Sequence, residues 1–312
     1  MAKLLPDSMD FAAYERDTEC SAKIRRASEW VDDLQSAFDP DPDRPAMPIM
    51  ASTKLRDRIE FRPGEVTCWA GYSGHRKSML IGQAVCDFTA AGNKTLLASL
   101  EMSPATTLAR MARQVFATER PSRQAIERFA RWTDDRVWLF DHLGRATPAA
   151  IIGVTRYFAE ELKGHHVVID SMMMVVGSEK DLDEQKQFMT DLVRIAQETG
   201  LHMHLVAHCR KPESGTDDKP PSKYDVRGAS AITDQAHNVI TVWANKPKER
   251  KLAEDPTNVA MREEPDARVA VEKQRNGKFE GALKLWFHEQ SLRFVDHKYD
   301  IVRPYDIGDL DD

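Results

Sequence analysis

The sequence predicts an α/β fold with a mainly parallel central sheet, and the order of its elements carries this prediction. From residue 60 onward, short apolar strands alternate with helices. Alternating units of this kind imply a parallel sheet covered by helices on both faces. The last predicted strands follow one another without long helices between them, so we expect an antiparallel extension at the C-terminal end. No run of eighteen apolar residues occurs, so no membrane span is expected.

Turn and cap residues set the predicted element boundaries. Gly92 and Gly200 end two helices, and Pro104 and Thr147-Pro148 begin two others. The predicted strands cover residues 66–71, 94–101, 137–141, 166–171, 202–208, 239–245, 267–275 and 282–289. The predicted helices cover residues 78–92, 104–116, 147–162 and 181–199.

The N-terminal part has a different pattern. Residues 10–38 interleave charges with apolar residues at helical spacing, which predicts an amphipathic helix. The apolar positions are Ile24, Ala27, Trp30, Val31 and Leu34. Pro and Asp are frequent in residues 39–48, as in a linker. We therefore predict three parts: a linker helix and linker (1–48), a main α/β domain (49–298) and an acidic tail (299–312).

Composition limits the location and the partners. The N-terminus has no secretory signal pattern, so a cytoplasmic location is expected. Cys20, Cys68, Cys86 and Cys209 are far apart, which makes zinc or disulfides unlikely roles for them. The net charge of −6 means that any nucleic-acid site must be a local patch or a ring of several chains.

The stretch GYSGHRKS (71–78) follows a predicted buried strand and precedes a helix. It matches the phosphate-binding pattern G-x-x-x-x-G-K-[ST] except that Arg76 replaces the second glycine. Lys77 would reach the phosphates of ATP, and the Ser78 hydroxyl would hold Mg²⁺. The predicted nucleotide-binding residues are Gly71, Ser73, Gly74, His75, Arg76, Lys77, Ser78 and Met79. The alternative is an ordinary glycine-containing turn between a strand and a helix.

Three more polar residues end predicted strands, where ligands of parallel sheets bind. Asp170 ends VVID and is a predicted Mg²⁺ ligand. Glu101, which ends the strand one over from the loop, would accept a proton from water or orient the water. His208 would hydrogen-bond the γ-phosphate. The alternatives are a capping aspartate, an exposed strand-end acid and a buried structural histidine.

Two basic segments follow these strands. Residues 209–228 form a long, polar, proline-rich loop that includes Arg210, Lys211 and Lys223. Several copies around one axis could sum their contacts to a nucleic-acid backbone. In KQRNG, Lys273 and Arg275 could reach the γ-phosphate of a neighbouring subunit. The alternatives are a mobile surface loop and a solvated basic turn.

Taken together, these segments resemble the DnaB-like hexameric replicative helicases, including phage primase–helicases and the mitochondrial helicase. FRPGEVTCWAGYSGHRKS, ASLEMSPATTLARM and VVIDSMMMV look like the strand with the phosphate loop (Walker A), the segment of the catalytic glutamate, and Walker B. LVAHCRKP, DVRGASAITDQAHNVITVW and KQRNGKFEGALKLWF resemble the remaining three motifs. The match is collinear over roughly residues 50–296.

The resemblance implies a RecA-like core in a ring of six, with ATP between subunits and single-stranded DNA in the pore. Lys77, Glu101 and His208 would be catalytic, with Lys273 and Arg275 acting in trans. DNA would contact Arg210, Lys211, Lys223, Arg227 and Gly228. The linker helix would dock on the adjacent subunit, and the acidic tail could bind a polymerase or primase. The alternative for the tail is a solubilising segment.

Two departures from the family pattern leave alternatives open. Asp234 stands where the family has glutamine, with Gln235 one residue later. Arg76 replaces the loop glycine, and we expect it to fit with a negative φ and an outward side chain. The leading interpretation is an ATP-driven 5′→3′ helicase. The others are a nucleotide-binding ring with little hydrolysis, such as a loader or scaffold, and a recombinase-type filament or clock-like ATPase.

Overall fold

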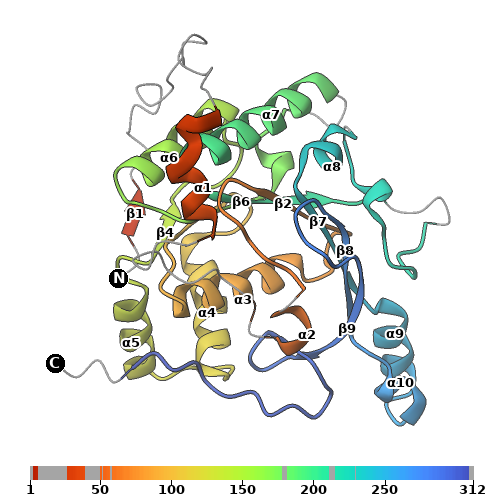
Figure 1. Ribbon diagram of the computed structural model, residues 1–312. Helices are drawn as coiled ribbons and strands as arrows, with labels where there is room; N and C mark the ends of the chain where they lie inside the picture. Colours follow the sequence, from red (N-terminus) through yellow and green to blue (C-terminus); the bar gives the residue numbers. More distant parts are fainter. Residues whose placement is uncertain are drawn as a thin grey trace.

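The computed structural model describes residues 3–5, 27–38, 50, 52–56, 58–177, 181–210, 215–228 and 230–308. Over these residues the chain forms one ten-stranded sheet in the order β1-β4-β3-β5-β6-β2-β7-β8-β9-β10 (Figure 1). Pairing is parallel from β1 to β7 and antiparallel from β7 to β10. The predicted α/β fold and its antiparallel C-terminal extension are therefore confirmed.

The observed strands agree closely with the predicted ones. They are β1 (Lys3–Leu5), β2 (Val66–Gly71), β3 (Thr95–Ser99), β4 (Val137–Phe140), β5 (His166–Asp170), β6 (His202–His208), β7 (Asn238–Ala244), β8 (Ala267–Gln274), β9 (Gly281–His288) and β10 (Arg293–Val295). The short strands β1 and β10 are additions that the sequence did not indicate. Both are three residues long, too short for a periodic pattern.

The helices cover both faces of the sheet. They are α1 (Val31–Phe38), α2 (Thr53–Arg56), α3 (Lys77–Ala90), α4 (Pro104–Phe116), α5 (Arg123–Thr133), α6 (Pro148–Glu160), α7 (Leu182–Thr199), α8 (Ala231–Gln235), α9 (Lys246–Glu254) and α10 (Val259–Glu263). Figure 1 shows α6 and α7 on one side of the strands and α3 and α4 on the other. Helices α4 and α6 begin at Pro104 and Pro148, as predicted, and the side chains of Ser103 and Thr147 cap them.

Alternation along the central strands divides the core into two halves. In β2, Val66, Cys68 and Ala70 pack with side chains from α6 and α7, whereas Trp69 packs with side chains from α3 and α4. Successive side chains of a strand point to opposite faces, so one strand serves both halves. The middle of the sheet is therefore rigidly held, and its strand ends have fixed positions. No helix among the described residues is long and apolar enough to cross a membrane.

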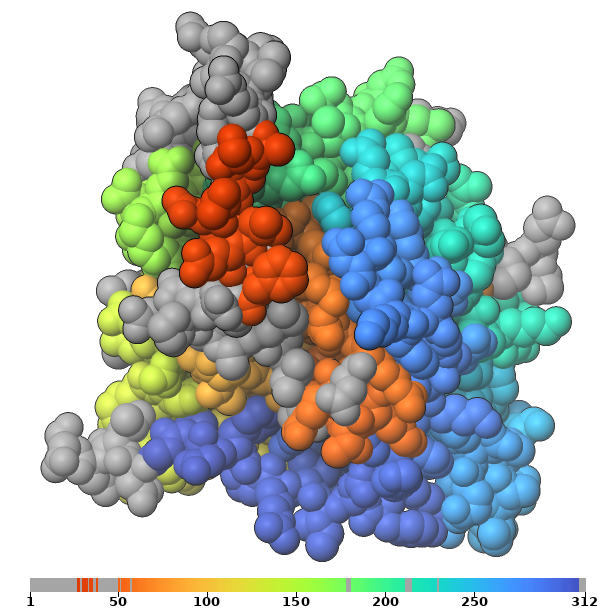
Figure 2. Space-filling model, viewed as in Figure 1, coloured from red at the N-terminus to blue at the C-terminus, as the bar shows by residue number. Residues whose placement is uncertain are grey.

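Of the predicted N-terminal helix (residues 10–38), the structure describes residues 27–38. A 3-10 turn (Ala27–Trp30) leads into α1, while residues 6–26, with Ile24, and 39–49 lie outside the described residues. Trp30, Val31, Leu34 and Phe38 are 46–78% exposed. Figure 2 shows residues 27–38 (red) on the surface of the molecule. These four apolar side chains are thus largely exposed over the part of the chain that the structure describes.

The C-terminal segment packs on the domain as far as residue 308. The Tyr305 hydroxyl donates a hydrogen bond to Asp87 of α3 (2.6 Å), and Ile307 is buried. The Gly308 carbonyl accepts a hydrogen bond from Arg128 of α5. In Figure 2 this segment (dark blue) crosses the lower edge of the molecule. The predicted tail boundary at residue 299 does not correspond to a change in packing, because residues beyond 299 still contribute to the core.

Five of the described helices were not expected from the sequence, including the short helices α2 and α8. Helix α5 precedes β4, and the pair α9 and α10 lies between β7 and β8, where we expected no long helix. The α9–α10 segment, KPKERKLAEDPTNVAMREE, has few apolar residues, and Val259 is 70% exposed. A helix that covers little core has no strong hydrophobic periodicity, which is the signal that sequence analysis uses.

Candidate nucleotide site and nucleic-acid loop

The phosphate loop joins β2 to α3 at the carboxyl end of the sheet. A Cβ atom on Gly71 would lie 2.3 Å from the Val242 carbonyl of β7, so only glycine fits there. Gly74 has a φ of 78°, which also favours glycine. Lys77 begins α3, whose first N–H groups are free to face a phosphate.

Lys77 is held inside the loop and is only 5% exposed. Its Nζ donates hydrogen bonds to the carbonyls of Gly71 (3.0 Å) and Tyr72 (2.9 Å) and lies 3.4 Å from His208 Nδ1. Burial lowers the pKa of Lys77, and the charges of Asp170 and Glu101 act in the opposite direction. The ammonium group is therefore fixed beside the carboxylates.

Ser78 and Asp170 form the predicted metal pair. The Ser78 hydroxyl donates a hydrogen bond of 2.6 Å to Asp170 Oδ2. Burial raises the pKa of Asp170, and the bond from Ser78 opposes that shift. A hydroxyl and a carboxylate are hard oxygen ligands, and Mg²⁺ typically takes one or two such protein ligands together with phosphate oxygens. The residues present therefore fit Mg²⁺.

Glu101 lies beside the same pair. The Ser171 hydroxyl donates to Glu101 Oε1 (2.6 Å), and His208 Nε2 lies 3.6 Å from that oxygen. His208 first, and Ser171 next, lower the pKa of Glu101 to about 2. The carboxylate is thus ionised at neutral pH, which suits it to orient a water molecule by accepting its hydrogen bond.

Four consecutive strands bring these groups together. In the sheet order β3-β5-β6-β2, Glu101 follows β3, Asp170 ends β5, His208 ends β6 and Lys77 follows β2. Asp170 pairs in register with Ser99, and His208 pairs with Gly71. One expectation was wrong: β3 lies three positions from β2, because β5 and β6 insert between them. Glu101 contacts His208, at the end of β6, and Ser171, which directly follows β5.

Arg76 differs in its backbone from what we expected. Its φ is 63° and its ψ is 21°, in the left-handed region, so the expected negative φ was wrong. The reason is the geometry of the turn, which requires at this position the conformation that glycine adopts freely. The side chain does point outward: it forms an ion pair with Glu249 of α9 (3.0 Å) and lies 4.2 Å from the ring centre of Phe287. Both contacts hold Arg76 away from Lys77.

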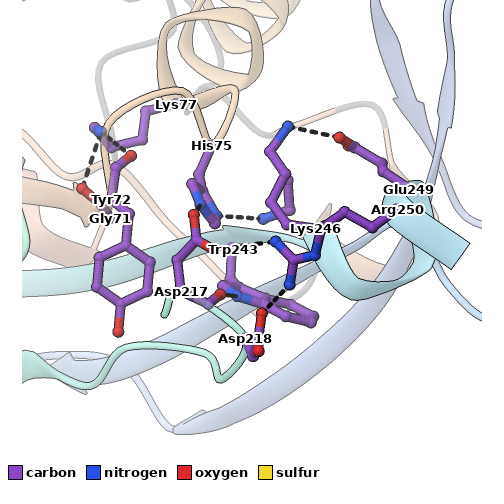
Figure 3. A network of polar contacts seen from close by, with 11 residues as sticks. Gly71, Tyr72, His75, Lys77, Asp217, Asp218, Trp243, Lys246, Glu249 and Arg250 are labelled. Carbon is purple, nitrogen blue, oxygen red and sulfur yellow. Dashed lines mark hydrogen bonds and ion pairs between the residues drawn. The ribbon is translucent and has the colours of Figure 1, made fainter. Parts of the chain in front are cut away.

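His75 also points away from the phosphate side. Its side chain is buried, its Nδ1 accepts a hydrogen bond from the Ala244 N–H (3.1 Å), and its Nε2 lies 2.9 Å from Asp217 Oδ2 (Figure 3). Burial lowers the pKa of His75. Of the predicted nucleotide-binding residues, His75 and Arg76 therefore direct their side chains away from the phosphate side, and the His75 N–H donates to the Tyr72 carbonyl (3.3 Å).

The loop between β6 and β7 encloses a basic cavity of about 350 Å³. Its lining is Arg210, Lys223, Tyr224, Val226, Gly228, Ser230, Thr233, Asp234 and Lys273. The hydrogen bond from Arg210 N to Asp225 O (2.7 Å) joins the two arms of the loop, and the bond from Arg227 N to His208 O (2.8 Å) fastens the loop to β6. Lys211 lies outside the described residues. The predicted DNA-binding residues are thus tied directly to the strand that carries His208.

Lys273 and Arg275 differ in their exposure and in their hydrogen bonds. Lys273 Nζ donates to the carbonyls of Thr233, Asp234 and Ala236 at the end of α8 (2.7–2.9 Å). Arg275 lies one residue beyond β8 and is exposed. The Arg275 guanidinium donates one long hydrogen bond to the Asp234 carbonyl (3.4 Å). Arg275 is therefore more exposed and more loosely held than Lys273, which is engaged by three carbonyls of its own chain.

Sequence analysis missed three residues of this region. Ser171 follows Asp170 in VVIDS and was not among the predicted site residues. Asp217 lies in the loop and contacts His75. Tyr224 is 85% exposed beside Lys223. The exposed aromatic flanked by lysine was visible in PPSKYD, but the other two contacts depend on the fold.

The chain is similar to known proteins in sequence. A family model described as "AAA domain" matches residues 51–214, more than half of the chain. A "DNA helicase/primase" from Enterobacteria phage T3 is 26% identical over 212 residues, which is 62% of this chain and 38% of that relative. The chain thus spans well under half of that relative's length.

Two solved structures have a similar fold. One is titled "ATPase Domain of G40P" (TM-score 0.69, 16% identity, 88% of this chain and 99% of that chain). The other is a DnaB-like replicative helicase studied with primase (TM-score 0.69, 15% identity, 86% of this chain and 68% of that chain). The chain therefore belongs to the AAA domain family, and its core has the fold of the ATPase domains of DnaB-like replicative helicases.

Proposed function

We propose that the protein is an ATP-dependent replicative DNA helicase that acts as a ring of six subunits on single-stranded DNA, moving 5′→3′. The observation that carries this proposal is the grouping of Lys77, Ser78, Asp170, Glu101 and His208 at four consecutive strand ends. A lysine, a hydroxyl–carboxylate pair and an ionised second carboxylate are the parts that hydrolysis of a nucleoside triphosphate requires.

Each group has a distinct role in ATP hydrolysis. Lys77 and the backbone N–H groups of the loop hold the phosphates. Ser78 and Asp170 would hold Mg²⁺, which supplies positive charge against the phosphate oxygens. Glu101 orients the attacking water, and its low pKa keeps it ionised for that purpose. His208 lies within reach of both Lys77 and Glu101, so it can respond to loss of the γ-phosphate.

The β6–β7 loop is the proposed contact to DNA. Arg210, Lys223 and Arg227 would pair with phosphates, with Gly228 at the close turn. Tyr224 adds an exposed ring on which a base can stack. We expect Tyr224→Ala to weaken binding of oligo(dT) and Tyr224→Phe to retain it, measured by fluorescence anisotropy. Equal affinity in all three proteins would exclude stacking at this position.

Ring assembly would cover the apolar face of α1. Trp30, Val31, Leu34 and Phe38 are exposed in one chain, and a second copy is the proposed occupant. In such a ring Arg275 would act on the ATP of the neighbouring subunit. We expect Leu34→Glu to shift the protein from rings to smaller species in mass photometry. Gln35→Glu adds the same charge beside the apolar face and should leave the rings intact.

The C-terminal end is the proposed contact to a polymerase or primase. Since Tyr305 and Ile307 are part of the core, truncation should begin after residue 308. Co-purification of a polymerase or primase that survives this truncation would argue against docking through residues 309–312.

Turnover measurements separate the helicase from a ring that binds ATP without hydrolysing it. We expect ATPase activity to rise with single-stranded DNA and to be lost in Lys77→Ala but kept in Lys186→Ala, an exposed lysine on α7. Forked duplexes with one 5′ or one 3′ tail then give the direction. Tight ATP binding without turnover would favour the non-hydrolysing ring, and electron microscopy distinguishes rings from filaments.

A further inference from the structure

His75 connects the phosphate loop to the β6–β7 loop through a buried polar contact. The ring is 1% exposed, and both of its nitrogens are engaged. Since Nδ1 accepts the Ala244 N–H, the ring proton lies on Nε2 and is donated to Asp217. This donor lies two residues before Lys77 and within the turn that would hold the phosphates.

Asp217 is fixed from three directions. Its side chain accepts the His75 bond, its carbonyl accepts a hydrogen bond from Trp243 Nε1 (2.8 Å), and Arg250 of α9 lies 3.6 Å from its Oδ1. Figure 3 shows these groups converging on Asp217 from the phosphate loop, β7 and α9. The contacts to Trp243 and Arg250 hold Asp217 in place, and of these three contacts the bond to His75 is the one that extends to the phosphate loop.

We propose that the His75–Asp217 bond is a latch that couples nucleotide binding to strand binding within one subunit, with Asp217 as a positioning residue for the phosphate loop. Movement of the turn on phosphate binding is passed through this bond to residues 215–228, and the reverse also holds by linkage. The latch rests on the proposed function, since it requires that the protein bind both a nucleotide and single-stranded DNA.

The charges around the latch are consistent with a strong bond. The bond from His75 is the main cause that lowers the pKa of Asp217, so this carboxylate is ionised and the bond is charge-assisted. Lys246 and Lys77 also face His75 and disfavour a second ring proton. The neighbouring carboxylate, Asp218, pairs with Arg250. Asp218 therefore provides a matched control.

The experiment measures the affinity for a fluorescent ADP analogue with and without oligo(dT), in the wild type and in Asp217→Ala, Asp217→Asn and Asp218→Ala. We expect the ratio of the two affinities to fall at least fivefold in Asp217→Ala, the lower end of typical coupling. Asp217→Asn keeps an acceptor oxygen and should retain most of the ratio. Asp218→Ala should match the wild type, and all four proteins should melt at similar temperatures.

Two results would overturn the latch: an unchanged ratio in Asp217→Ala, or an equal loss in Asp218→Ala. The same data distinguish a failure of the proposed function. A wild type that binds neither ligand, or in which oligo(dT) never alters nucleotide affinity, would refute the strand-coupled ATPase itself. If oligo(dT) alters nucleotide affinity equally in the wild type and in Asp217→Ala, only the latch would be refuted.

Discussion

Arg76 provides a quantitative test of the phosphate loop, because its backbone and its side chain make opposite contributions. The left-handed backbone favours glycine, whereas the side chain is stabilised by Glu249 and Phe287. Arg76→Ala removes the side-chain contacts and keeps the unfavourable backbone. Arg76→Gly removes the contacts and relieves the backbone. The difference between the two variants isolates the strain.

The expected magnitudes follow from the geometry. A guanidinium 4.2 Å from a ring centre contributes about 1 kcal/mol. The ion pair contributes below about 1 kcal/mol, since its side chains are 18% and 37% exposed. Left-handed backbone costs a non-glycine residue about 1 kcal/mol. We therefore expect Arg76→Ala to lower the free energy of unfolding by about 1–2 kcal/mol and Arg76→Gly by about 1 kcal/mol less.

Urea unfolding, analysed by linear extrapolation, measures both values. Binding of a fluorescent ADP analogue, measured in parallel, should be intact or tighter in Arg76→Gly. A glycine variant less stable than the alanine variant would refute the strain argument. Loss of nucleotide binding in Arg76→Gly would show that the arginine side chain is itself a ligand.

Three further predictions concern the core, the C-terminal segment and the basic strand. Burial lowers the pKa of His202 to about 4; the unfolded chain therefore takes up this proton first, and stability falls as the pH drops from about 6.5 towards 4. The pKa difference of His202 alone should lower the free energy of unfolding by about 2 kcal/mol at pH 5. Equal urea midpoints at pH 7 and pH 5 would contradict this. Tyr305→Phe should cost about 1 kcal/mol by removing the bond to Asp87 and should speed proteolysis after residue 295; unchanged cleavage would argue against the packing role. Arg275→Ala should reduce ATP turnover about 10³-fold without changing the urea midpoint, whereas Lys273→Ala should lower the midpoint as well, because three carbonyls lose their donor. A stable Lys273→Ala protein would show that the carbonyl contacts are dispensable.

The parallel core could be predicted because each of its strands is a buried apolar run bounded by turn residues. Val66–Gly71 and His202–His208 have the same bounds in the prediction and in the structure. The order of the strands in the sheet was not accessible in the same way. Insertion of β5 and β6 between β3 and β2 depends on which helices cross which face, and local patterns do not contain that information. The expected position of Glu101, one strand from the phosphate loop, was therefore wrong, although its place just beyond the end of a strand agrees with the prediction.

Polar residues inside the core were harder to interpret. His202 and His204 lie on a strand at alternate positions, which is compatible with a metal pair. In the structure each ring is buried and hydrogen-bonded: His202 to Thr67 and Arg62, His204 to Trp69 and His166. Within the described ranges, no group of three or more His, Cys, Asp and Glu side chains could hold a metal ion. Their partners come from strands far apart in sequence, so spacing alone cannot distinguish the two roles.

The same limit applies to His75 and Arg76 of the phosphate loop. Their contacts lie at Asp217 and Glu249, about 140 and 170 residues away by sequence number, in a polar loop and in a helix that periodicity did not reveal. A glycine at position 76 would meet the backbone requirement with no partner at all. An arginine meets it only if the rest of the fold supplies stabilising contacts, and α9 together with β9 does so. Arg76 is therefore compatible with a working phosphate loop because of a helix outside the core motifs, and disruption of α9 should affect the loop before it affects the sheet.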